Sequence, residues 1–116
     1  MNEILEKTLL YDFYGELLTA HQKDIYEQYI LEDLSLSEIA INQGVSRQGV
    51  HDLVRRCEKI LEDYENKLHL VEKFLSIRNK VSQMEECFAG YDKEGLRVEE
   101  LIKSVRQLSK EILEQL

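Results

Sequence analysis

The stretch LSLSEIAINQGVSRQGVHDLVRR, residues 34–56, predicts the fold of this protein. Ser35 and Glu38 have the spacing of a capping box at the start of a short helix. Gly44 supplies the positive φ that ends this helix, and Ser46 is placed to cap the next one. Two capped helices joined by a turn with one glycine are the sequence form of a helix-turn-helix.

The second helix of this pair is apolar on one face and basic elsewhere. Its inward positions keep helical spacing and are Val50, Leu53, Val54, Cys57, Ile60, Leu61 and Tyr64. Residues 47–59 carry four basic and two acidic groups, whereas residues 1–46 carry nine acidic and two basic groups. A DNA-binding helix fits this pattern, and so does a plain helical interaction module, because many small helical hairpins share the spacing.

Further helices flank this core on both sides. Residues 2–14 form one helical stripe that ends near Gly15, and Thr19 opens the next helix with a second capping box. Two apolar seams at heptad spacing follow residue 70, and between them residues 89–95 (AGYDKEG) predict a loop. The seam residues are Phe74, Ile77, Val81, Met84 and Phe88, then Val98, Leu101, Val105, Leu108, Ile112 and Leu116. The seams fit an antiparallel hairpin, or in part a dimer contact. Whether the helix from Arg47 runs unbroken or bends around residues 66–69 is open.

Composition places the chain in the all-α class. It has 116 residues, 43% hydrophobic and 33% charged, with no proline, which excludes collagen-like and disordered classes. We expect a helix-turn-helix domain with its N-terminal packing helix over residues 1–68. A helical extension over residues 69–116 is expected to pack on it as one globular unit. The absence of a long apolar run and of a signal peptide predicts a cytoplasmic protein.

The sequence contains no pattern typical of a catalytic, cofactor or metal site. Cys57 and Cys87 stand 30 positions apart without a C-x-x-C partner, so they are interpreted as small hydrophobic residues. We therefore interpret the protein as a non-enzyme without a cofactor. The net charge of −8 argues against a protein whose main role is to coat phosphate.

Six candidate nucleic-acid contacts lie in the first half of the basic helix: Arg47, Gln48, His51, Arg55, Arg56 and Lys59. The first three are candidates for reading base edges, with arginine suited to guanine and glutamine to adenine. The last three are candidate phosphate contacts. Asp52 lies in the middle of this face, where a carboxylate repels phosphate unless it accepts a hydrogen bond from cytosine. An ordinary solvated helix face would carry similar residues.

Several short motifs lie within residues 12–70: DFY at 12–14, LED, LSL and EIA within 31–40, GVSRQGVHD at 44–52 and LEDYENKL at 61–68. Through these motifs the segment resembles the YlxM family of small bacterial helix-turn-helix proteins. The stretch LSLSEIAINQGVSRQGV also resembles the promoter-reading C-terminal domain of bacterial sigma factors. On that pattern Arg47, Gln48, His51 and Arg55 occupy positions of the recognition helix.

The resemblance implies a sigma-like helical core over residues 19–66 and a regulatory DNA-binding role. Because genes of the YlxM family typically lie beside those for the signal recognition particle GTPases, it also implies a role in that pathway. The alternative is a protein-interaction adaptor that docks components of the signal recognition particle without binding DNA. The partners expected are therefore duplex DNA or structured RNA, those components, and a second copy of the chain, because the two seams exceed what one hairpin must bury.

Overall fold

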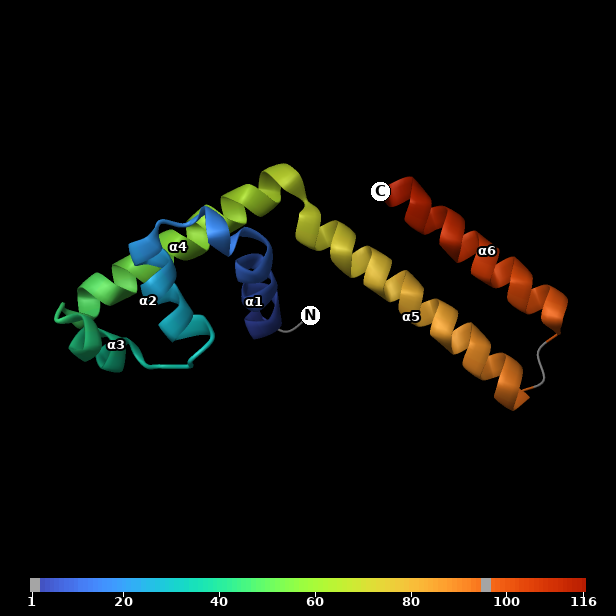
Figure 1. The fold of residues 1–116 in the computed structure, drawn as a ribbon, viewed down its shortest axis with the longest axis horizontal. Coiled ribbons are helices and arrows are strands. Elements are labelled where there is room, and N and C mark those ends of the chain that lie inside the picture. The colour runs from blue at the N-terminus through green and yellow to red at the C-terminus, as the bar shows by residue number, and fades with distance from the viewer. Residues whose placement is uncertain (1–2, 95–96) are drawn as a thin grey trace. The chain divides into compact units, whose positions relative to one another are not determined.

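The computed structural model describes residues 3–94 and 97–116, and within these ranges every regular element is a helix. The elements are α1 (Glu3–Tyr14), η1, a 3-10 helix (Gly15–Leu17), α2 (Ala20–Ile30), α3 (Leu36–Gln43), α4 (Arg47–Leu68), α5 (Leu70–Glu94) and α6 (Val98–Gln115) (Figure 1). The predicted all-α class is confirmed. The chain divides into two compact units, an N-terminal unit of Met1–Val71 and a C-terminal unit of Glu72–Leu116. None of the helices in the described part combines the length and apolar character that crossing a membrane requires.

Helix α4 is the centre of the N-terminal unit, because α1, α2 and α3 all pack against it (Figure 1). The core takes side chains from each of these helices, from the segment between η1 and α2, and from the start of α5: Leu9, Leu10, Tyr11, Tyr14, Leu18, Ile25, Tyr26, Ile39, Ala40, Val50, Val54, Cys57, Leu61 and Val71. Burial of this set supplies the main stabilisation of the unit. It also fixes which side of α4 turns outward.

Both predicted capping boxes are present. The Thr19 backbone N–H donates to Gln22 Oε1 at 3.0 Å, and the Gln22 backbone N–H donates to Thr19 Oγ1 at 3.2 Å. The Ser35 backbone N–H donates to Glu38 Oε1 at 3.2 Å, and the Glu38 N–H donates to Ser35 Oγ at 3.1 Å. The helices α2 and α3 therefore begin where the sequence predicts.

The helix that begins at Arg47 does not run unbroken into α5, because it is interrupted at His69. Helix α4 ends at Leu68, and His69 adopts the left-handed conformation with φ of 56°. The Tyr14 hydroxyl donates to Glu65 Oε1 at 2.5 Å and accepts from the Leu70 N–H at 3.2 Å, while the Val71 N–H donates to Glu65 Oε1 at 3.0 Å. These two side chains satisfy free amides of the first turn of α5. Of the two alternatives left open by the sequence, the bend is the one observed.

Replacing Tyr14 with phenylalanine is expected to lower the free energy of unfolding by about 1 to 3 kcal/mol, because the Leu70 amide loses its acceptor inside the fold. Tyr14 is 1% exposed, and burial, with the hydrogen bond to Glu65, raises the pKa of its hydroxyl. Urea denaturation followed by circular dichroism measures the change. Tyr64→Phe is the matched control, since Tyr64 stacks on Tyr14 and its hydroxyl has no hydrogen bond to the described residues. Equal costs for the two variants would contradict the capping role.

The C-terminal unit is an antiparallel hairpin of α5 and α6 (Figure 1). The Gln115 amide on α6 donates to Ser76 Oγ of α5 at 2.8 Å, and Lys80 Nζ donates to Gln115 Oε1 at 2.7 Å. In this unit, every side chain that the structure describes is half-buried or exposed. Two helices alone therefore leave much of their apolar surface in contact with water.

The loop predicted over residues 89–95 is wrong for most of its length. Helix α5 continues through Ala89 and Gly90 to Glu94, and Gly95 lies outside the described residues. Phe88 and Tyr91 continue the helical spacing of apolar residues, and one glycine inside a helix costs only about 1 kcal/mol. Gly90 was therefore too weak a signal to end the helix.

Candidate nucleic-acid interface

The turn between α3 and α4 has the predicted geometry. Gly44 has φ of 66° and ends α3, and its N–H lies within reach of the Ala40 and Ile41 carbonyls. The Ser46 side chain then accepts the Gly49 N–H at 3.0 Å and caps α4. The predicted N-cap is confirmed. These two residues position the first turn of α4 at the protein surface.

Burial confirms the predicted orientation of α4 for four of the seven inward positions, while Leu53, Ile60 and Tyr64 are half-buried. Val50, Val54, Cys57 and Leu61 are at most 4% exposed. Leu53, predicted as a core residue, is only half-buried, because it lies at the edge of the stripe rather than on its centre. The opposite face carries four exposed side chains: Gln48, Asp52, Arg55 and Lys59.

The arginines of this surface are available to an anionic partner. Arg47, Arg55 and Arg56 are exposed, and none forms an ion pair with a residue in the part of the chain that the structure describes. Lys59 differs, since its Nζ lies 3.8 Å from Asp63 Oδ1 one turn further along. Such an exposed pair is weak, so Lys59 can exchange this partner for another anion.

Two of the candidate base readers interact with Asp52. The Gln48 side-chain amide donates to Asp52 Oδ1 at 2.9 Å. His51 Nδ1 lies 3.6 Å from the same oxygen, which is too long for a hydrogen bond, and this buried nitrogen has no hydrogen-bond partner among the described residues. Asp52 therefore holds Gln48 in place and places a negative charge in the centre of the face.

A hollow of about 290 Å³ lies beside this face, lined by Glu3, Lys7, Tyr29, Leu36, His51, Val54, Arg55 and Glu58. Lys7 Nζ lies 3.6 Å from Glu58 Oε1 and 3.8 Å from Glu3 Oε1. The Glu58 side chain is 14% exposed, so α1 covers and neutralises one of the two carboxylates in the basic segment of α4. The sequence alone did not predict the pairing of Lys7 with Glu58, because the two residues come together only when α1 packs on α4.

The chain matches the family described as "Putative helix-turn-helix protein, YlxM / p13 like", UPF0122, over residues 1–101. The chain belongs to the UPF0122 family. It is similar to a UPF0122 protein of Thermoanaerobacter sp. (strain X514), with 42% identity over 113 residues that cover 97% of this chain and 96% of the relative. A UPF0122 protein of Acetivibrio thermocellus is 39% identical over 98% of this chain and 99% of the relative. One of Caldanaerobacter subterraneus is 49% identical over 74% of each chain.

In this UPF0122 protein the two cysteines are both free thiols. Cys57 is fully buried in the core of the N-terminal unit, and burial raises the pKa of its thiol to about 11. The thiol is therefore neutral at physiological pH and packs as a small apolar group. The burial of Cys57 fits its interpretation as a small hydrophobic residue.

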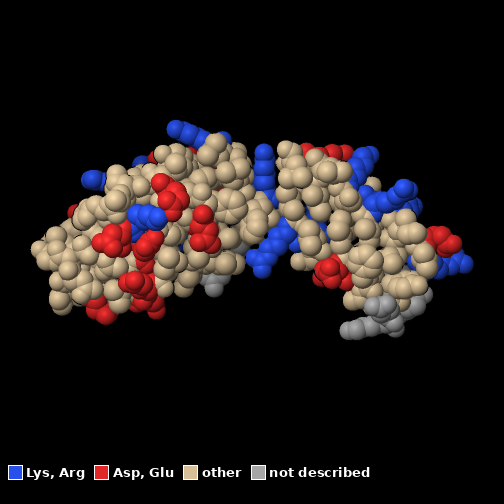
Figure 2. Space-filling view, in the orientation of Figure 1, with Lys and Arg blue, Asp and Glu red and all other residues tan. Residues whose placement is uncertain are grey.

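Acidic residues surround the helix-turn-helix of this UPF0122 chain. On the face shown in Figure 2, Asp and Glu side chains gather over the middle of the N-terminal unit. Residues 1–46 contribute nine carboxylates and two lysines, so only α4 offers a concentration of cations in this unit. On electrostatic grounds, the first half of α4 is the part of this unit that would repel a polyanion least.

Replacing Asp52 with asparagine is expected to raise affinity for nucleic acid about three- to tenfold, the effect of removing one screened charge from the face. Asparagine keeps the shape of the side chain and an acceptor for Gln48. The affinity is measured by fluorescence anisotropy with a labelled nucleic-acid pool, and the gain should shrink as salt is added. Glu99→Gln on α6 makes the same charge change away from this face. An equal gain in affinity from Glu99→Gln would contradict a specific effect of Asp52.

Proposed function

We propose that this UPF0122 protein is a regulatory nucleic-acid-binding protein that acts through its helix-turn-helix. The observation that supports the proposal is the group of exposed arginines on the first half of α4, Arg47, Arg55 and Arg56, which lack ion pairs to the described residues. Arg47 follows directly on the turn between α3 and α4, and Arg55 and Arg56 lie more than two helical turns further along. In a helix-turn-helix, such a turn presents the start of the second helix to a groove. The protein acts by binding rather than by catalysis.

Each candidate residue has a role in this proposal. Arg47, Gln48 and His51 lie in the first turns of α4 and approach base edges, as the N-terminal residues of a recognition helix do. Gln48 must exchange its bond to Asp52 for a base, preferably adenine, to read sequence. The remaining contacts, Arg55, Arg56 and Lys59, lie further along the helix and bind phosphate.

The test is a titration of labelled duplex DNA and structured RNA at several salt concentrations. If all six side chains engage duplex DNA, five of them can carry a positive charge, since Gln48 is neutral, and log K is expected to fall with log salt with a slope of about −4 to −5. A weak affinity that does not change with salt would contradict the proposal. The ratio of the DNA and RNA affinities identifies the preferred ligand.

A second candidate function is an adaptor that docks components of the signal recognition particle. The acidic surface of residues 1–46 supports it, because basic RNA-binding proteins are attracted to such a surface. A pull-down with the full chain from bacterial lysate, before and after nuclease treatment, separates the two functions. Retention of a signal recognition particle GTPase after nuclease, identified by mass spectrometry, favours the adaptor. Loss of every partner favours nucleic-acid binding.

A further inference from the structure

The α5–α6 hairpin has an inward face that its own hydrogen bonds define. Gln115 contacts Ser76 and Lys80 of α5, so this side of α6 faces α5. Leu108 and Leu101 lie seven and fourteen residues earlier on α6, so they share the side of Gln115 and are half-buried with it. Lys80 and Cys87 are the corresponding half-buried positions of α5.

The residues that come one position after these inward residues in the sequence are mostly apolar and exposed. Val81, Phe88, Ile102 and Leu116 are 45%, 46%, 51% and 84% exposed, and Ser109 is the exception to the pattern. Each is turned about 100° from the inward direction in the same sense along its own helix. Because the two helices run antiparallel, this rotation brings all of them to one flank of the hairpin, here called the apolar flank.

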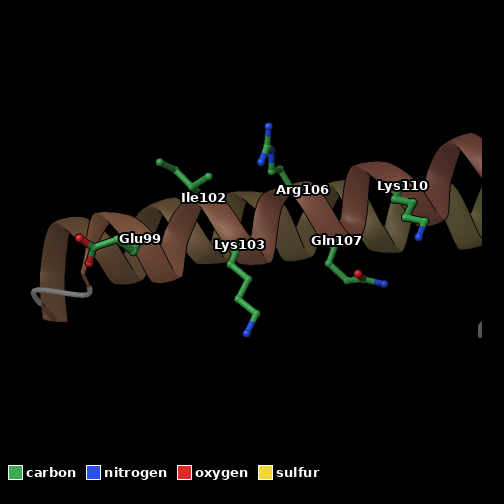
Figure 3. Close-up of a pocket in the computed structure, with 6 residues that line it drawn as sticks. All are labelled: Glu99, Ile102, Lys103, Arg106, Gln107 and Lys110. Carbon is green, nitrogen blue, oxygen red and sulfur yellow. The ribbon is translucent and has the colours of Figure 1, made fainter.

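The residues that precede the inward positions form the opposite flank and are all polar and exposed: Asn79, Glu86, Glu100, Gln107 and Glu114. In Figure 3, Ile102 and Arg106 point to one side of α6, and Lys103 and Gln107 point to the other. An open hollow of about 460 Å³ lies along this outer surface. Among the side chains that the structure describes, therefore, only one flank of the hairpin is apolar along its length.

We propose that the apolar flank is the interface with a second copy of this chain. Two hairpins joined through this flank form a four-helix bundle, in which heptad-spaced residues pack between helices at about 20°. Val81 and Phe88 are seven residues apart, as are Ile102, Ser109 and Leu116. A second copy provides a surface with matching spacing, and a two-fold axis brings the two identical flanks together.

The size and charge of the hairpin favour this occupant. A flank the length of the 18 residues of α6 is about 27 Å long and about 20 Å across two helices, a projected area on the order of 500 Å². This is the same order of magnitude as the roughly 800 Å² that one partner buries in a standard interface. The opposite flank carries Glu86, Glu100 and Glu114, whose like charges oppose self-association there.

The seam residues predicted as a possible dimer contact lie on two different faces of the hairpin. Leu101 and Leu108 lie on the inward face of the hairpin, whereas Val81 and Phe88 lie on the apolar flank. A charge at Leu108 would therefore disturb the hairpin itself. The interface is better probed from the flank. The proposed dimer interface goes beyond the proposed function, because it can be tested by measuring molecular mass in the absence of nucleic acid.

Light scattering of the full chain is expected to give twice the chain mass of 13.7 kDa at micromolar concentration. Val81→Lys should return the mass to that of one chain, because it places an unpaired charge in the interface. Asn79→Lys adds the same side chain to the opposite flank and should leave the dimer intact. A wild-type mass of one chain at high micromolar concentration would overturn the proposal, as would a folded Val81→Lys dimer.

A second measurement does not depend on the folding of the lysine variant. In a Cys87→Ser background, the rate of thiol alkylation is compared for Ile102→Cys and Lys103→Cys as protein concentration rises. The rate at position 102 should fall in proportion to the dimer formed, while the rate at position 103 stays constant. Equal behaviour at the two positions would overturn the interface. Cys57 contributes little signal because it is 0% exposed.

Discussion

Leu61→Ala is expected to lower the free energy of unfolding by about 2 to 5 kcal/mol. Leu61 is 0% exposed and lies on α4, the helix against which α1, α2 and α3 pack. Removing its side chain leaves a cavity that three helices would have to move to fill. Urea denaturation of the full chain, followed by circular dichroism, measures the loss.

Leu53→Ala is the matched control, because it removes the same atoms from the half-buried edge of the same helix. Its cost should be clearly smaller, comparable to the roughly 1 kcal/mol expected for Ser46→Ala, which removes the cap of α4. If Leu53→Ala cost as much as Leu61→Ala, the orientation of α4 described above would be wrong. The outward face with its arginines would then be wrong as well.

Replacing Arg47, Arg55 and Arg56 together with glutamine is expected to weaken nucleic-acid binding about 100- to 1000-fold at moderate salt. Removing three positive charges from the interface also makes the salt dependence less steep by about 3, at about 0.9 for each counterion that is no longer released. The arginines are exposed and make no ion pairs in the described part, so their loss should leave the stability of the fold nearly unchanged.

The C-terminal unit provides a control with the same change in net charge. Lys103, Arg106 and Lys110 lie on the outer surface of α6 (Figure 3), and replacing them with glutamine also removes three positive charges. This variant should bind nucleic acid nearly as well as the wild type. An equal loss from both variants would show that total charge governs binding, and the assignment of the site to α4 would fail.

The fold could be predicted from the sequence where local chemistry decides the structure. Thr19, Ser35 and Ser46 cap helices at the predicted positions, and Gly44 has the predicted left-handed conformation. These features depend on contacts within a few residues, so spacing alone identifies them. The break at His69 was harder to predict, because the Tyr14 hydroxyl that accepts the Leu70 amide lies far away along the chain.

The residues of the candidate site could be predicted from the sequence, but their interactions with other helices could not. Helical spacing places Gln48 and Asp52 one turn apart, and the hydrogen bond between them follows from that spacing. The pairing of Glu58 with Lys7 does not, since it depends on how α1 packs on α4. Leu53 was misplaced because a helical stripe has a width that spacing does not define.

The bond from the Leu70 amide to the Tyr14 hydroxyl joins residues 56 positions apart in the chain. A ribosome adds about 5 to 20 residues per second, so Tyr14 leaves the exit tunnel roughly 3 to 11 s before Leu70 does. Helices α2, α3 and α4 are neighbours in sequence and can associate as soon as they emerge. During synthesis, α2, α3 and α4 can therefore associate before the bond between Tyr14 and Leu70 forms, and the contacts that hold α1 are complete only when the start of α5 has emerged.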